Sequence, residues 1–226
     1  NNTGFHRTAN EISRKNNLGQ ETFGGRIRAQ IPIGYIGVSG YHNRFDKMIE
    51  RGSLPSQVYS FSGRGQTALS ADYRLLLGYS LFFSEAVYTD NGGYGIVTGG
   101  EFSPSSSTDL VIVYRYYDKT LQAFYGAGFG EQSGYPRNEE GFYTGISHAV
   151  TPALKISAYF DQFRFPSARF QTSSPSSGYD WLGRIEYTSS RIFSIYALFR
   201  HKKRGQDYST ANEYGREITL QGNHRR

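Results

Sequence analysis

The stretch GFYTGISHAVTPALKISAYFDQFRF, residues Gly141–Phe165, decides the fold class of this sequence. From Leu154 onward apolar and polar residues alternate with a period of two, so that Leu154, Ile156 and Phe160 share one face. Proline cannot donate a hydrogen bond to a strand ladder, and Pro152 therefore marks a turn between two strands. The stretch predicts a β-hairpin with one apolar and one polar face.

The composition of the whole chain favours strands. Of the 226 residues, 16% are aromatic, 27 are glycine and one is methionine, and few stretches have the apolar spacing of a helix. The absence of cysteine excludes a disulfide framework and a thiolate metal site. Apolar runs such as Leu110–Tyr114 are far shorter than the roughly 18 residues that a membrane-spanning helix needs. A membrane β-barrel is compatible with such runs, because its strands span with about 9 to 11 residues and half of these are polar.

The sequence predicts two parts, residues 1–21 and residues 22–226. In the first part, Thr8 followed three residues later by Glu11 matches a capping box, which predicts one short helix in a helix/loop segment ahead of the barrel strands. In the second part, alternation and turn residues predict about eleven strands. Their expected ranges are Thr22–Ile31, Ile33–Phe45, Gln66–Leu77, Tyr79–Tyr88, Tyr94–Ser103, Thr108–Tyr117, Gly141–Val150, Ala153–Arg164, Trp181–Thr188, Arg191–Lys202 and Glu213–Gly222.

Short and long connections alternate between these strands. The longer ones fall at residues 46–65, 89–93, 118–140, 165–180 and 203–212. Outer-membrane barrels have short turns on the periplasmic side and longer loops outside, whereas a soluble sandwich has no general reason for this asymmetry. The sequence therefore predicts an all-β, antiparallel transmembrane β-barrel of about 11–12 or more strands in the bacterial outer membrane.

The direction of the strands suggests a barrel larger than this sequence. With the long loops outside, the first predicted strand and the last one both run inward. A closed barrel with an even number of strands begins and ends on the periplasmic side. We therefore expect at least one further strand before Thr22, unless the strand count is wrong by one.

Charged residues gather on the strand face opposite the apolar one. An Arg or Lys on the lipid face costs about 2–4 kcal/mol near the midplane, which explains the segregation, although a sandwich core would also exclude charge. These residues form either a selectivity lining for a solute or oppositely charged pairs that neutralise one another, and their mixed signs favour the pairs. The lumen-facing candidates are Arg26, Arg28, Asp72, Arg74, Glu85, Glu101, Arg115, Lys155, Asp161, Arg184, Glu186, Arg200 and Glu217.

Aromatic residues near strand ends are expected to form the interfacial girdles of the barrel, unless they are there simply as good strand formers. The girdle candidates are Tyr41, Phe45, Tyr88, Phe102, Tyr116, Tyr117, Phe163, Phe165, Trp181 and Tyr187.

A basic run, His201, Lys202, Lys203 and Arg204, is expected at the outer end of its strand. It either binds the phosphates of lipid or lipopolysaccharide or is a solvated loop tip. The net charge of +6 would suit anionic partners in the same way.

No motif indicates catalytic, cofactor or metal chemistry. The segment Gly128–Gly134 resembles a dinucleotide fingerprint, but its spacing is one residue too long and no helix is predicted after it. The five histidines have no local metal-ligand spacing, and no nucleophile elbow surrounds a serine. We therefore predict no catalytic residue, no metal and no cofactor.

Three segments resemble a known family. The runs NEEGFYTGI (138–146), YFDQFRFP (159–166) and PSSGYD (175–180), with the opening GFHRT (4–8) and Glu11, are similar to the barrel portion of large outer-membrane proteins that carry upstream helix-hairpin-helix modules. The resemblance covers nearly the whole chain and implies a barrel, but its motifs are not catalytic. The modules themselves are absent from this sequence, so the resemblance implies no nucleic-acid binding here.

The leading functional hypothesis is a non-enzymatic outer-membrane barrel that acts as a structural or complex subunit or as a pore. Its expected partners are outer-membrane lipid, lipopolysaccharide, and other outer-membrane or periplasmic subunits. One alternative is a membrane-embedded barrel hydrolase that acts on lipid or peptide. The other is a soluble β protein that binds glycan through its aromatic residues.

Overall fold

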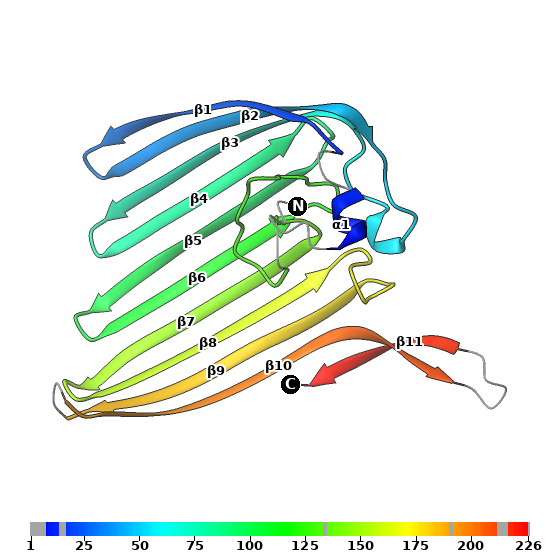
Figure 1. Ribbon diagram of the computed structural model, residues 1–226. Coiled ribbons are helices and arrows are strands. Elements are labelled where there is room, and N and C mark those ends of the chain that lie inside the picture. The colour runs from blue at the N-terminus through cyan, green and yellow to red at the C-terminus, as the bar shows by residue number, and fades with distance from the viewer. Residues whose placement is uncertain (1–7, 14–16, 133–134, 190–191, 212–216, 226) are drawn as a thin grey trace.

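The computed structural model describes residues 8–13, 17–132, 135–189, 192–211 and 217–225. Eleven strands form one antiparallel sheet, in which each strand pairs with its neighbours in sequence (Figure 1). The strands are β1 (Gln20–Ile31), β2 (Gly34–Ile49), β3 (Gly63–Leu77), β4 (Ser80–Thr89), β5 (Tyr94–Ser105), β6 (Thr108–Tyr117), β7 (Glu139–Thr151), β8 (Leu154–Phe165), β9 (Ser176–Thr188), β10 (Ser194–Ala211) and β11 (Glu217–Arg225). The predicted all-β, antiparallel fold class is confirmed. Within the described chain β1 and β11 are the two edges, and the sheet is open.

Helical structure is confined to two short segments of the described chain. These are α1 (Ala9–Ser13) and the 3-10 helix η1 (Pro55–Gln57). The short helix predicted after Thr8 is confirmed, and the Ile12 amide donates a hydrogen bond of 2.9 Å to the Thr8 carbonyl. Neither of these helices has the length and apolar character that would let it cross a membrane.

Strand β10 is longer than the sequence indicated. Residues 203–211, predicted to lie in a loop, continue the strand and pair with β11, and Lys203 and Arg204 also pair with β9. Lysine, glycine and aspartate are depleted in strands, and the stretch from Lys203 to Asp207 contains all three. Pairing with β11 along the whole stretch, and with β9 at Lys203 and Arg204, overrides this local preference.

The two ends of the sheet differ in their connections, as the sequence predicted. Tight turns join β1 to β2, β3 to β4, β5 to β6 and β7 to β8 at one end (Figure 1). In the β3–β4 turn, Gly78 has φ of +60°, a left-handed conformation that glycine adopts without strain. The opposite end carries the connections 50–62, 90–93, 118–138 and 166–175.

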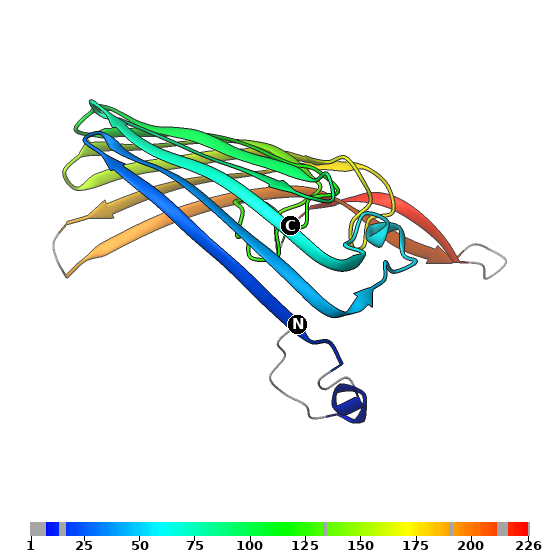
Figure 2. The same ribbon diagram turned by 90° about the horizontal axis from the view of Figure 1, so that it is seen from above.

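The sheet is curved, so it has a convex and a concave face (Figure 2). Ile156 of β8 pairs with Ile185 of β9, which pairs with Ala197 of β10, and this row lies on the convex face. Ile27 of β1 and Phe199 of β10 are 75% and 60% exposed on the same face. The apolar face predicted from the period of two is therefore one continuous surface across distant strands.

The buried residues lie on the other side of the sheet. The connection 118–138 between β6 and β7, called the inner loop below, lies on the concave face (Figure 2). Its residues Leu121 and Ala123 form a buried cluster with Tyr117, against which Val87 and Val97 pack. The core of this protein is thus the contact between the inner loop and the concave face.

Candidate functional site

The candidate site is the concave face together with the inner loop that covers it. Polar contacts hold this loop in place, in addition to the apolar cluster described above. The side-chain amide of Gln122, which is fully buried, donates a hydrogen bond of 2.6 Å to the Tyr59 carbonyl. The side-chain amide of Gln66 in β3 donates to the Gln122 carbonyl. The inner loop is therefore tied to both β3 and the connection 50–62.

A buried ionic cluster lies under the C-terminal part of the inner loop. The Arg115 guanidinium, 0% exposed, donates from Nε to Glu139 Oε1 at 2.7 Å. It also donates from Nη1 and Nη2 to the two oxygens of Asp161 at 2.8 and 3.1 Å. Glu139 accepts backbone N–H bonds from Glu131 and Gln132 of the inner loop at 2.9 and 3.3 Å. One arginine thus joins three strands and the loop.

A glycine makes room for this arginine. Gly141 of β7 is the register partner of Arg115, and a Cβ at this position would collide with the guanidinium. The arginine side chain therefore lies flat across β7 and reaches Asp161 on β8. Only glycine lets the guanidinium approach a strand backbone this closely.

A second ionic cluster lies next to the first one on β9 and β10. Asp180 accepts a hydrogen bond of 3.0 Å from Arg200 Nε. Lys202 Nζ lies 2.5 Å from Glu131 Oε2 of the inner loop and 3.7 Å from Asp180 Oδ2. These contacts fasten the same loop to the strands on its other flank.

The remaining predicted lumen-facing residues are also placed on the concave face, with one exception. Arg26 pairs with Asp72 at 2.8 Å, and Arg184 pairs with Glu186 at 2.9 Å. The side chain of Glu217 lies outside the described part of the structure. Those that occupy concave positions without a salt bridge to another described residue are Arg28, Arg74, Glu85, Glu101 and Lys155.

The basic run in β10 is divided between the two faces. His201 and Lys203 occupy convex positions, and the His201 ring lies 5.6 Å from the Tyr179 ring. Lys202 and Arg204 occupy concave positions, where Lys202 is ion-paired with Glu131. The expected location at a strand end is wrong, because β10 continues to Ala211. Phosphate binding by this run as a single cluster would need all four side chains on one face.

The predicted aromatic girdle is corrected in the same way. Tyr41, Phe45, Tyr117, Phe163 and Phe165 occupy concave positions, and the last four are buried there. The other five girdle candidates keep convex positions. Successive side chains of a strand point to opposite faces, so adjacent residues such as Tyr116 and Tyr117 never share one, and a position near a strand end does not by itself assign a face.

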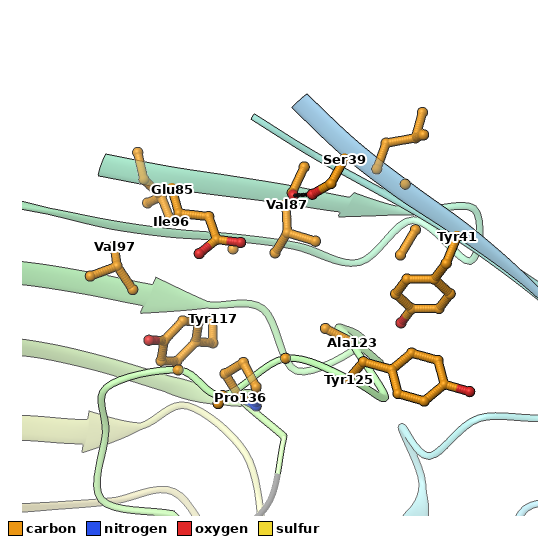
Figure 3. A pocket seen from close by; sticks show the side chains of 18 residues that line it. Ser39, Tyr41, Glu85, Val87, Ile96, Val97, Tyr117, Ala123, Tyr125 and Pro136 are labelled. Atoms are coloured by element: carbon orange, nitrogen blue, oxygen red, sulfur yellow. Dashed lines mark hydrogen bonds between the residues drawn. The ribbon is translucent and has the colours of Figure 1, made fainter. Parts of the chain in front are cut away.

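An apolar cavity of about 240 Å³ lies between the inner loop and strands β2 to β5 (Figure 3). Val87, Val97 and Tyr117 form part of its wall, with Glu85 as its acidic residue. The rings of Tyr41 and Tyr125 meet edge to face at 4.9 Å at its side. Sequence reasoning missed this cavity, because nothing in the inner loop's sequence indicates that it folds onto the concave face.

A second cavity, called the basic cavity below, has a volume of about 380 Å³ and lies among the long connections. Of the described residues that line it, four are cationic and one, Glu131 of the inner loop, is acidic. The cations are Lys119, Arg137, Arg169 and Arg204. Sequence reasoning identified only Arg204, since these positions are far apart in the chain and share no motif.

Among the described residues, no group of three or more His, Asp or Glu is arranged to hold a metal ion. Comparison with protein-family models, with curated proteins and with solved structures gives no match. The function is therefore argued from the geometry of this chain.

Proposed function

We propose that this protein is a β-barrel protein of the bacterial outer membrane, with a non-enzymatic role as a structural or complex subunit or as a pore. The observation that carries the proposal is the continuous apolar convex face. Ile27, Ile185 and Phe199 are 75%, 52% and 60% exposed on it. Soluble monomers rarely expose contiguous apolar patches larger than a few hundred Å². A lipid bilayer would cover such a surface at no cost in free energy.

The position of the convex charges supports the same proposal. In β1 to β10 these charges lie toward the end with the long connections, and the middle of the face is free of them within the described chain. Examples are Glu21, Arg44, Glu140, Arg164 and Lys203. Charge on the lipid face is costly at the midplane and costs little at the interface. The charged end would then lie at the outer lipid headgroups, in contact with lipid and lipopolysaccharide.

Convex aromatic residues lie toward both ends of the face, and near the tight turns the rings of Phe82 and Phe102 lie 5.6 Å apart. Others lie near the long connections. The rings of Tyr94 and Tyr116 stack at 5.4 Å, and those of Trp181 and Phe199 lie 5.0 Å apart. The Tyr114 hydroxyl donates a hydrogen bond of 3.2 Å to Glu140. Amphipathic rings of this kind are enriched where the hydrocarbon meets the headgroups.

The direction of the edge strands supports a larger barrel. Every neighbouring pair is antiparallel, so β1 and β11 run in the same direction. Outer-membrane barrels close through antiparallel pairs, and closure between these two edges would therefore require an odd number of further strands. We propose that the sheet is one part of such a wall.

The placement of the inner loop favours a filled or narrowed interior. Its contacts with Arg115, Gln66 and Lys202 place it against the concave wall over several strands. A loop in this position would reduce the cross-section of the lumen. This supports a structural subunit or a narrow pore rather than a wide one.

Two measurements test the proposal. The purified protein should stay monodisperse in detergent or lipid, aggregate when these are removed, and migrate differently in gels before and after heating. Stable monomers in plain buffer would contradict membrane insertion. In planar bilayers, replacing residues 123–130 by a short Gly-Ser linker should raise the single-channel conductance. If both forms are silent, the structural role is supported and the pore is excluded.

A further inference from the structure

The basic cavity differs from the two neighbouring ionic clusters in its charge balance. Arg115, Arg200 and Lys202 of the neighbouring clusters are all ion-paired with carboxylates. None of the four cations that line the basic cavity is ion-paired with a carboxylate in the described part of the chain. The carboxylate of Glu131, which also lines it, is bound to Lys202 at 2.5 Å. The lining therefore carries a local excess of positive charge.

Three segments of the chain bring these cations together. Lys119 and Arg137 belong to the two ends of the inner loop, Arg169 to the connection 166–175, and Arg204 to β10. Tyr59, from the connection 50–62, completes the wall. The volume of about 380 Å³ falls in the range of sites that hold small molecules.

Three of the cations are held in place by neutral groups. Lys119 Nζ lies 4.4 Å from the centre of the Tyr59 ring, and the Arg169 guanidinium lies 4.5 Å from that of Phe165. Arg137 Nη1 donates a hydrogen bond of 3.2 Å to the Ser60 hydroxyl. These contacts fix the positions of the charges and leave the charges themselves uncompensated.

The surroundings of Arg169 give the most direct indication that the cavity binds an anion. Its Nη2 donates to the Gly205 carbonyl, whereas its Nε is buried and has no hydrogen-bond partner among the residues that the structure describes. Burial, and then the neighbouring charge of Arg204, lower the pKa of the Arg169 guanidinium. An unfilled buried donor and repulsion between two arginines are both costly, and a bound anion would relieve both.

We propose that the basic cavity is a binding site for a phosphate monoester or pyrophosphate group. Guanidinium groups match phosphate oxygens with two parallel N–H···O bonds, and Arg169 and Arg204 are the residues placed to supply them. Lys119, which also lines the cavity, adds a point charge. The site belongs to the concave side of the sheet and does not depend on membrane insertion.

Isothermal titration of the detergent-solubilised protein with inorganic pyrophosphate tests this proposal. Saturable binding is expected, and Arg204→Gln and Arg169→Gln should each weaken it about tenfold or more, as expected for the loss of a charged hydrogen bond. Lys203→Gln is the matched control, because it removes the same charge one residue away on the convex face. It should change the affinity less than about twofold, since its side chain points to the opposite face of β10 from Arg204. Circular dichroism, which reports β-sheet content with or without a membrane barrel, checks that each variant is folded.

A second arm separates a soluble ligand from a lipid headgroup. Binding is measured to vesicles of phosphatidylcholine with and without phosphatidic acid, a lipid that carries a phosphate monoester. Binding of pyrophosphate alone identifies a soluble ligand, whereas binding of phosphatidic acid that is lost in Arg204→Gln identifies a headgroup. Failure of both probes to bind the wild-type protein would overturn the proposal, as would an equal loss of binding in Lys203→Gln.

Discussion

Arg115 and Glu139 form a fully buried ion pair, with Nε 2.7 Å from Oε1, at the point where the inner loop returns to the sheet. Glu139 also accepts the backbone N–H of Glu131 at 2.9 Å, so the arginine positions the loop through the glutamate. Asp161 occupies the other side of the guanidinium. The position of the inner loop thus depends on the charge of Arg115 in β6.

Replacing this arginine should be strongly destabilising. Arg115→Met leaves the carboxylates of Glu139 and Asp161 buried without a cation, and we expect the free energy of unfolding to fall by about 3–5 kcal/mol. Urea unfolding in detergent micelles measures the change. Arg164→Met is the control, because that arginine is exposed in its pair with Glu140 and its loss should cost about 1 kcal/mol or less. Equal effects of the two variants would contradict the structural role of the buried cluster.

A side chain at Gly141 should destabilise the protein. In Gly141→Ala the new Cβ collides with the Arg115 guanidinium, and we expect a loss of about 1–3 kcal/mol of stability from overpacking. Gly183→Ala offers a matched control, since a Cβ there has no atom within 4 Å. That variant should be neutral or slightly stabilising, because glycine in a strand is entropically costly. The same unfolding assay compares them, and two variants of similar stability would show that Arg115 does not lie across β7.

The strands were predictable from the sequence, but most of the site was not. Alternation around Ile156 and Ile185 identified the apolar face, because a period of two is a property of each strand alone. The position of the inner loop has no such local signal, since residues 118–138 lack a periodic pattern. Arg115 and Asp161 were identified as inward charges, whereas Glu139 was not, because its role depends on the path of the loop.

The basic cavity was missed for a related reason. Lys119 and Arg204 line the same cavity only after the inner loop, the connection 166–175 and β10 have folded together, and their separation in the sequence hides them from any motif search. Arg204 was instead grouped with its neighbour Lys203, although the two point to opposite faces of β10. Grouping charges by adjacency fails inside a strand, where successive side chains alternate.

A charge on the convex face should be costly only in lipid. Ile185→Arg places a cation in the apolar band, and we expect it to lower stability in lipid vesicles by about 2–4 kcal/mol. Val111→Arg is the control, because Val111 lies on the concave face opposite Glu101 and beside an open groove. Its cost should be smaller by about 2 kcal/mol or more, since the cation stays hydrated. The folded fraction at increasing urea gives both values, and an unaffected Ile185→Arg variant would argue against lipid contact.

The central claim, that the convex face meets lipid, can be tested residue by residue along β8. The chain contains no cysteine, so single-cysteine variants can be labelled specifically with a fluorophore. In vesicles that contain brominated lipids, labels at positions 156, 158 and 160 should be quenched, while labels at 155, 157 and 159 should not. An alternation of quenching with a period of two is the predicted result. Uniform quenching, or no quenching at any of the six positions, would contradict the account.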